Sequence, residues 1–254
     1  MSPAAILRVC LLAMLLGVLC ALPPAQAAPS LLVVTEDSSW LAYLDANGNL
    51  AGRNVETVRA LLIRAGLKSD IQVMPWARAY ALAEKRPNTL IFSIARTPER
   101  EKRFVWLGVL ARMQRTFFRL RDDGSLPPQS LDEVKSCCKV CVGNRDVNEE
   151  FLRKAGFEEN INFITADRVA DCPRLVQSGA AQLLLGDPEQ IHSQMRRQRL
   201  PADQLQSVLT LPSANDLYLA ANPKTDPATL QSLQQAYRNL IDPATGKPRA
   251  PRSN

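Results

Sequence analysis

The sequence predicts an α/β protein made of two similar units that the chain connects twice. Short apolar segments alternate with amphipathic helical segments, which is typical of a mainly parallel sheet flanked by helices. This alternation stops at a proline-marked break over 124–134 and then starts again. Two extended segments, near 114–122 and 214–222, stand where the chain would leave one unit and return to it. We therefore expect two lobes with two hinge crossings and a cleft, where ligands commonly bind.

The first unit has the order strand, helix, strand, helix, strand. Apolar residues at helical spacing predict a first helix, with Asn54 as its cap and Gly66 at its end. Pro75 suits the first position of a second helix, which continues to Lys85. The three short apolar or alternating runs that predict strands lie at 30–37, 70–75 and 89–94.

The second unit repeats this order after the break. Its predicted strands lie at 139–144, 160–165 and 181–187, and its predicted helices at 147–156 and 167–179. After the second extended segment, a last helix is predicted at 227–241. These elements assign 28–115 and 217–241 to lobe 1, and 116–216, which includes the hinge strands, to lobe 2. The basic segment 242–254 is expected to be a disordered tail.

Residues 1–27 have the features of a signal peptide. Arg8 is followed by an apolar run and then by Ala-Gln-Ala, a small-x-small cleavage pattern. The run is shorter than the roughly 20 residues that a spanning helix needs. We expect cleavage before Ala28 and export to the periplasm, with an uncleaved anchor as the alternative.

The distribution of charge along the chain argues against a nucleic-acid partner. The chain has a formal net charge of +6, which falls by one when Arg8 leaves with the signal. Apart from the tail, basic and acidic residues are interspersed. A nucleic-acid footprint would need a basic stripe with interleaved aromatic residues, so no nucleic-acid partner is expected.

Four cysteines remain after the signal, in a compartment where disulfides persist. Cys137 and Cys138 are adjacent, and their Cα atoms, about 3.8 Å apart, are closer than in most disulfides. Cys172 lies early in a helix that should start at the cleft end of the sheet, and Cys141 lies further up its strand than the adjacent pair. We therefore favour a bridge between Cys141 and Cys172. The alternative is four reduced, buried thiols.

Metal, cofactor and nucleophile chemistry find little support. His192 is the one histidine and lies in a charged helical stretch, so neither a histidine-activated nucleophile nor a zinc cluster is expected. Cys138 and Cys141 have the C-x-x-C spacing but lack a second such pair. Phosphate-cradling glycine loops are absent from the sequence.

Polar and aromatic residues follow the predicted strands, and in a parallel sheet these strand ends share one rim. The candidates are Glu36, Asp37, Trp40, Trp76, Ser93, Arg96, Arg100 and Asp187. Thr97 could cap a helix that begins at Pro98. The free backbone N–H groups in the first turn of that helix, together with an arginine, would form an anion site. The alternative is that Arg96 and Arg100 form surface ion pairs with Glu99 and Glu101.

Several segments together are similar to one known family. These are "LVVTEDSSWLAYLDANGNLAGRNVETVRALL" (32–62), "PWARA" (75–79) and "SIARTPEREKRF" (93–104) followed by "VWLG". They resemble the polar amino-acid-binding periplasmic proteins of ABC transporters. The resemblance covers nearly all of 30–240, more strongly in the first lobe, and implies the type II periplasmic binding protein fold.

The resemblance also implies roles for individual residues. Arg100 would grip the α-carboxylate of the ligand with help from Ser93, and Asp187 would hold the α-ammonium. Glu36 or Asp37, with Trp40, would line the pocket. Asp146 replaces a serine or threonine that usually touches the carboxylate, so a second carboxylate there would favour a ligand with an extra charge. Arg96 replaces an apolar residue, and Ala95 a common serine.

We therefore expect a monomeric periplasmic binding protein for a small polar solute, an amino acid or related compound, that serves uptake by a membrane ABC permease. Capture would involve no reaction and no cofactor. One alternative is a sensing module for a membrane receptor. A second is a dehydratase-like enzyme on the same scaffold, with Asp187 or Asp146 as its acid–base group.

Overall fold

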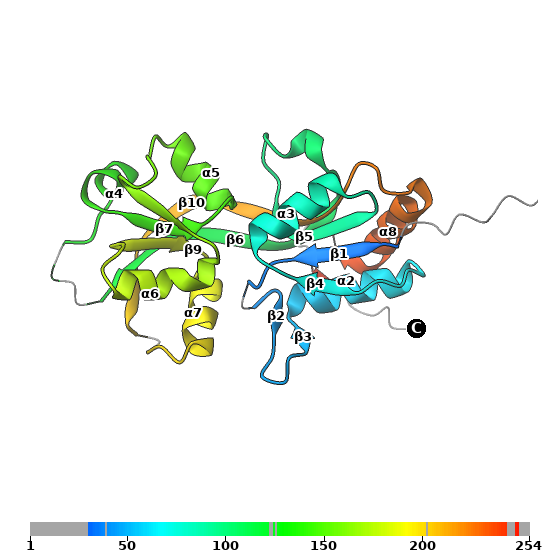
Figure 1. Ribbon diagram of the computed structural model, residues 1–254, viewed down its shortest axis with the longest axis horizontal. Coiled ribbons are helices and arrows are strands. Elements are labelled where there is room, and N and C mark those ends of the chain that lie inside the picture. Colours follow the sequence, from blue (N-terminus) through cyan, green and yellow to red (C-terminus); the bar gives the residue numbers. More distant parts are fainter. Residues whose placement is uncertain are drawn as a thin grey trace, which may run out of the picture. The chain divides into compact units, whose positions relative to one another are not determined.

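An eight-stranded mixed sheet forms the centre of the protein (Figure 1). The computed structural model describes residues 30–38, 40–121, 124, 126–201, 203–242 and 247–248. The predicted signal peptide and most of the predicted tail lie outside these residues. The strand order is β4-β1-β5-β10-β6-β9-β7-β8.

Lobe 1 contains the first three parallel strands of this order. They are β1 (Leu32–Thr35), β4 (Ile71–Val73) and β5 (Thr89–Ala95), and Val33 of β1 is paired with Ile71 and with Leu90. The helices of this lobe are α2 (Arg53–Arg64), α3 (Trp76–Lys85) and α8 (Pro227–Leu240). Tyr43–Leu44 (β2) and Leu50–Ala51 (β3) form a small hairpin.

Lobe 2 repeats the arrangement with β7 (Val140–Gly143), β8 (Phe163–Ala166) and β9 (Leu183–Gly186), which are also parallel. Its helices are α4 (Leu131–Cys137), α5 (Val147–Lys154), α6 (Cys172–Gln177) and α7 (Pro188–Arg197), and a 3₁₀ turn, η2 (Val169–Asp171), precedes α6. The expected strands, and a helix at each expected place in this lobe, are therefore present.

Two long strands connect the lobes, β6 (Val105–Leu120) and β10 (Leu205–Ala221). They pair with each other antiparallel over almost their whole length. At one end β10 pairs with β5, where Leu217 faces Ala95, and at the other end β6 pairs with β9, where Thr116 faces Gly186. The two hinge crossings therefore join the sheets of both lobes into one.

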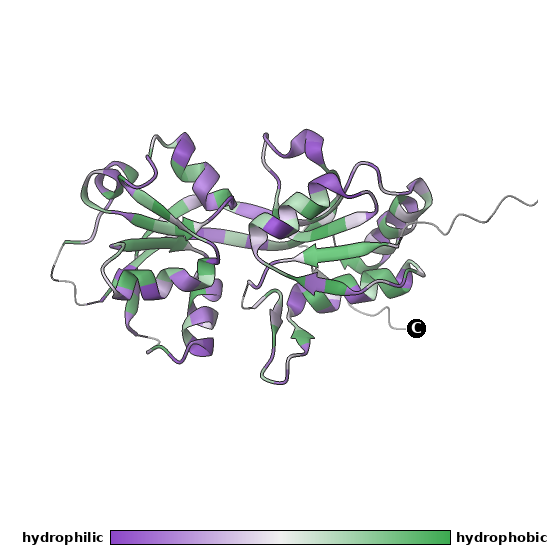
Figure 2. Cartoon of the chain, in the orientation of Figure 1, coloured by the Kyte–Doolittle hydropathy of each residue, from purple (hydrophilic) through white to green (hydrophobic). Residues whose placement is uncertain are grey.

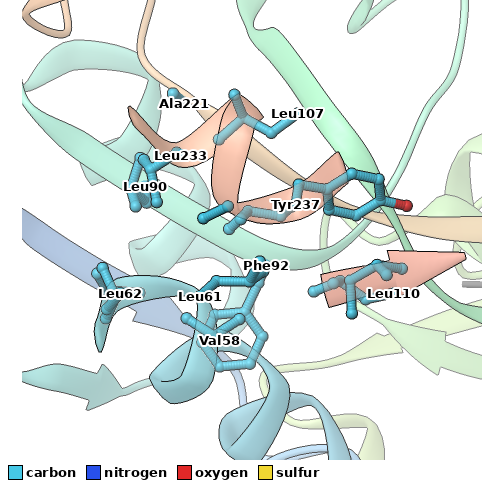
Figure 3. Close-up of a cluster of buried hydrophobic side chains, with 14 of the residues drawn as sticks. Val58, Leu61, Leu62, Leu90, Phe92, Leu107, Leu110, Ala221, Leu233 and Tyr237 are labelled. Atoms are coloured by element: carbon cyan, nitrogen blue, oxygen red, sulfur yellow. The ribbon is translucent and has the colours of Figure 1, made fainter. Parts of the chain in front are cut away.

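Buried apolar clusters pack against the sheet, and the colouring of Figure 2 shows that hydrophobic residues are concentrated on its strands. In one cluster, Leu61 of α2, Phe92 of β5 and Tyr237 of α8 pack together (Figure 3). The Tyr237 hydroxyl donates to the Val109 carbonyl at 2.8 Å. Its ring occupies the space that a Cβ on Gly108 would need, 2.1 Å from ring carbon Cζ, so glycine is required there.

The helix expected to begin at Pro98 is absent, and this prediction was wrong. Residues 98–100 form a turn, in which the Arg100 N–H donates to the Thr97 carbonyl at 3.0 Å, and a single 3₁₀ turn, η1 (Glu101–Arg103), follows. Because β6 already begins at Val105, too few residues remain to nucleate an α-helix.

Smaller differences concern caps and ends. Helix α2 begins at Arg53 with Gly52 as its N-cap, so Asn54 lies inside the helix and does not cap it. Helix α4 was not expected, although Ser130 accepts from the Glu133 N–H in the manner of a capping box. Within the predicted tail, Asp242 belongs to β11 (Ile241–Asp242), which pairs with β12 (Lys247–Pro248). No helix among the described residues has the length and apolar character needed to cross a membrane.

The structure places the cysteine sulfurs at bonding distance in two pairs. Cys141 of β7 and Cys172 of α6, both buried, have Sγ atoms 2.05 Å apart, in the pairing that the sequence favours. The Sγ atoms of Cys137 and Cys138, whose state the sequence left open, lie 1.97 Å apart. The first bridge ties the start of α6 to the middle of the sheet in lobe 2.

We predict that Cys141→Ser with Cys172→Ser lowers the free energy of unfolding by roughly 3–4 kcal/mol, because it opens a loop of 31 residues in the unfolded chain. Urea unfolding of variant and wild type measures this difference. Peptide mapping without reductant is the direct control. A Cys172 peptide recovered only as a free thiol would contradict the bridge.

Candidate ligand-binding pocket

A pocket lies at the carboxyl ends of β1 and β5, beside the N-termini of α5 and α7. Both lobes contribute to it: β1 is followed by Glu36, and α5 and α7 are preceded by Asp146 and Asp187. The residues that line it are Glu36, Ser38, Trp40, Leu41, Trp76, Ser93, Ala95, Arg100, Met113, Asp146, Val147, Asn148, Asp187, Gln190 and Leu217.

Most of the residues singled out from the sequence meet in this pocket, but Arg96 and Asp37 are not among its lining residues. Arg96 donates to both carboxylate oxygens of Glu101, at 2.7 and 2.6 Å, and its guanidinium lies over the Trp106 ring. Asp37 accepts from Arg197 at 2.8 Å. For Arg96, the surface ion pair is therefore what the structure shows.

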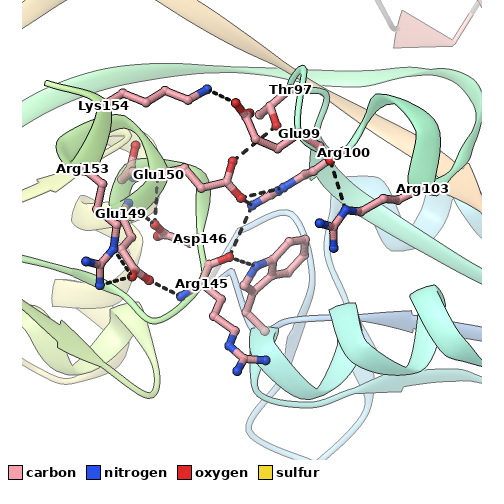
Figure 4. A network of polar contacts seen from close by, with 12 residues as sticks. Thr97, Glu99, Arg100, Arg103, Arg145, Asp146, Glu149, Glu150, Arg153 and Lys154 are labelled. Carbon is pink, nitrogen blue, oxygen red and sulfur yellow. Dashed lines mark hydrogen bonds and ion pairs between the residues drawn. The ribbon is translucent and has the colours of Figure 1, made fainter.

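Arg100 is 1% exposed and has a protein carboxylate as its partner (Figure 4). Its Nε donates to Glu150 Oε1 at 2.9 Å, and its Nη2 also forms an ion pair with Glu150. The same Nη2 donates to the Arg145 carbonyl at 3.3 Å. Glu99 and Glu101, the partners in the alternative of surface ion pairs, are not paired with Arg100.

Further contacts surround this ion pair. Thr97 Oγ1 donates to Glu150 Oε2 at 3.3 Å, and Trp76 Nε1 donates to the Arg145 carbonyl at 2.8 Å. Lys154 of α5 pairs with Glu99 at 2.6 Å. The turn at 97–100 is therefore held against the first two turns of α5 by polar contacts.

Two of the pocket's carboxylates cap helices. Asp146 Oδ1 accepts from the N–H groups of Asn148 and Glu149, both at 2.8 Å. Burial nevertheless raises the pKa of Asp146 to about 6, against the lowering effect of these N–H groups. The two hydrogen bonds satisfy the start of α5 and fix the carboxylate at the pocket wall.

Asp187 is 6% exposed and caps α7 in the same way. Its Oδ1 accepts from the N–H groups of Glu189 and Gln190, at 3.0 and 3.3 Å, and its Oδ2 accepts from the Gln114 N–H at 2.8 Å. Burial raises the pKa of Asp187 above its ordinary value, although these N–H groups oppose the rise.

Glu36 is the most perturbed group of the pocket. Burial raises its pKa from 4.5 to about 8, with further contributions from the negative charges of Asp146 and Asp37, while Arg100 opposes them. Strongly perturbed carboxylates that meet in a cleft are typical of functional sites. The pocket therefore concentrates acidic groups, and a cation entering it would favour their ionised form.

Apolar side chains form the remaining walls, among them Leu41, Met113 and Leu217. Trp40 lines one side, and the Arg53 guanidinium lies 4.9 Å from its ring centroid. Ser93 has a positive φ of 61° and accepts from Asn54 Nδ2 at 3.0 Å, so it is held in place from lobe 1.

Sequence reasoning missed Glu150 as the partner of Arg100, and it missed Ser38, Asn148 and Gln190 as lining residues. Glu150 lies 50 positions after Arg100. A local spacing rule could not have paired them, because only the packing of α5 against the turn at 97–100 brings them together. Among the described residues, no group of three or more His, Cys, Asp or Glu is arranged to hold a metal ion.

We predict that the pH dependence of stability depends on Glu36. Between pH 4.5 and 8 the folded protein holds a proton on Glu36 that the unfolded chain releases, so the free energy of unfolding falls as pH rises. Because Glu36 is partly exposed, we expect a loss of about 1–3 kcal/mol, less than the full pKa shift implies. Glu36→Gln should lack this loss, while the contribution of Asp146 remains in both proteins. Urea unfolding at pH 5 and pH 9 tests this, and parallel pH profiles would contradict it.

Comparisons with known proteins identify the family and the fold. The family model for bacterial extracellular solute-binding proteins, family 3, matches residues 31–245. No match was found among curated proteins. An ancestral arginine-binding protein bound to arginine has a similar fold, with a TM-score of 0.72, 17% identity, and coverage of 83% of this chain and 92% of that one.

Two other solved structures have the same fold. A histidine kinase sensor domain with similarity to periplasmic binding proteins has a TM-score of 0.71 and 19% identity, over 82% of this chain and 89% of its own. A putative L-cystine ABC transporter protein from Listeria monocytogenes has a TM-score of 0.69 and 19% identity, over 86% and 93%. The two-lobed fold is thus that of type II periplasmic binding proteins, and the chain belongs to the bacterial extracellular solute-binding proteins of family 3.

Proposed function

We propose that this protein captures a small organic cation with an amino group, an amino acid or a related amine, in the periplasm and delivers it to a membrane ABC permease. The observation that carries the proposal is the set of three carboxylates, Glu36, Asp146 and Asp187, that line one pocket.

Electrostatics supports a cation over other solutes. Burial opposes ionisation of all three carboxylates, and the negative charge of Asp146 also opposes ionisation of Glu36. A bound ammonium or guanidinium would reverse this, since an opposite charge favours the ionised form. Binding should then release protons near neutral pH.

The apolar walls support an organic ligand over an inorganic ion. Leu41, Met113 and Leu217 offer apolar contact, and Trp40 and Trp76 add aromatic wall area. A hydrocarbon body with a charged amino group fits this division into apolar walls and acidic groups.

The family and several similar structures support the biological setting. The arginine-binding and cystine transporter structures favour an uptake role, and the signal-like segment 1–27 favours the periplasm. The sensor-domain structure supports a second candidate, a sensing module that reports the same ligand to a membrane receptor. Co-purification with permease or receptor in the presence of ligand separates the two.

A thermal-shift screen of amines, amino acids, sugars and dicarboxylates tests the proposal. A cation present at 100 times its dissociation constant should add about 2.7 kcal/mol to the free energy of unfolding. The bound ligand should be recovered chemically unchanged, whereas turnover would favour the dehydratase-like alternative. Binding of a sugar or a dicarboxylate alone would contradict the proposal.

We predict that Asp146→Asn and Asp187→Asn each weaken binding of that cation by 2–5 kcal/mol, thirtyfold or more, because each removes a charge from a desolvated ion pair. Asparagine still caps a helix, so the fold should persist. Isothermal calorimetry measures the affinity. Glu189→Gln is the matched control, since Glu189 is an exposed acid in the first turn of α7. Equal effects of all three substitutions would remove Asp146 and Asp187 from the site.

A further inference from the structure

We infer that the ligand is an organic cation that carries no carboxylate, a simple amine or guanidine in place of an amino acid. The inference rests on the proposed function and narrows it. It comes from three positively charged or dipolar groups at the pocket, Arg100 and the N-termini of α5 and α7, each of which already holds a carboxylate of the protein.

Arg100 is engaged in a way that hinders recognition of a second carboxylate. A guanidinium grips a carboxylate bidentately through Nε with one Nη, or through its two Nη atoms. Here Nε and Nη2 bind Glu150, and Nη2 also donates to the Arg145 carbonyl. Both bidentate edges therefore include an engaged nitrogen, and only Nη1 is left for another partner.

The charge of Arg100 is also compensated. Glu150 provides a full negative charge, and it is held by Thr97 Oγ1 as well as by the arginine. An incoming ligand carboxylate would have to displace Glu150 from a guanidinium that is 1% exposed. Displacement would leave Glu150 without its charge partner, which is strongly unfavourable for a partly buried group.

The helix N-termini are occupied in the same way. The N–H groups at the start of α5 bind Asp146, and those at the start of α7 bind Asp187. Free helix N-termini would attract an anionic group, but here each presents a carboxylate to the pocket. A ligand carboxylate would meet these two acids, and the negative charge of each ionised carboxylate would repel it.

The same carboxylates suit a ligand with positive charge alone. Glu36 and Asp146 line the same pocket, and the negative charge of Asp146 opposes ionisation of Glu36, so an ammonium or guanidinium bound there would favour the ionised form of both. The structure thus has acidic groups for the cationic part of an amino acid, while the arginine for its carboxylate is already bound by Glu150.

Matched ligand pairs provide the experiment. Agmatine and arginine differ only in the carboxylate, as do cadaverine and lysine, putrescine and ornithine, and histamine and histidine. Calorimetry on the full mature protein should show that at least one amine binds ten or more times more tightly than its parent amino acid. Acetate serves as a carboxylate without an amine and should not bind.

Two variants test the role of Glu150. Glu150→Gln removes the charge that compensates Arg100, so amino acids should bind at least tenfold more tightly than to the wild type, and the preference for amines should shrink. Glu99→Gln is the matched control, because it removes the neighbouring ion pair with Lys154 of α5 without touching Arg100. Its preference should stay within twofold of the wild type. Circular dichroism confirms that each variant is folded.

The outcomes separate this inference from the proposed function. If the wild type binds amino acids as tightly as their amines, the inference is overturned and the proposed cation binding stands. If the Glu150→Gln variant is folded and keeps the full preference for amines, then Glu150 does not cause that preference. The inference would then fail, because it rests on Glu150 occupying Arg100. If neither class binds, both fail. The comparison of ligands on the wild type needs no variant, so the inference is testable even if Glu150→Gln does not fold.

Discussion

The antiparallel pairing of β6 with β10 is the interaction on which the rest of the structure depends. These strands extend through both lobes, and each also pairs with a strand of one lobe, β10 with β5 and β6 with β9. Because the two lobes share them, the strand ends of lobe 1 and the helix N-termini of lobe 2 meet at one pocket. Neither lobe alone has both Glu36 and Asp146, so the site exists only through this pairing.

Electrostatic balance at the pocket follows from that arrangement. Two of its carboxylates are held by helix N–H groups, and its buried arginine is held by Glu150. The protein thus neutralises its positive groups internally and leaves acidic groups with raised pKa values facing the pocket. A site of this kind gains most from a positively charged ligand, because the ligand supplies the charge that the pocket lacks.

Two ion pairs connect the lobes beside the pocket. Arg100 with Glu150, and Glu99 with Lys154, connect the end of lobe 1 with α5 of lobe 2. An exposed ion pair such as the second contributes little to stability. Removing Glu150 would be costly, because it would leave the buried guanidinium of Arg100 without a charge partner. The side chains that form these two ion pairs are different from the carboxylates proposed to bind the ligand, but Arg100 also lines the pocket, so its pairing with Glu150 bears on ligand choice as well as on the lobes.

The sequence by itself determined the α/β class, the strand order along the chain and the charged residues of the pocket, Glu36, Arg100, Asp146 and Asp187. Apolar periodicity is local, and residues at the ends of parallel strands, such as Glu36 and Asp187, must share one rim. Only the tertiary structure decided the state of the arginines. Arg96 turns to Glu101 at the surface, and Arg100 is buried against Glu150, 50 positions away. Charge pairing across such a separation depends on how helix α5 packs, and no local pattern of residues encodes that packing.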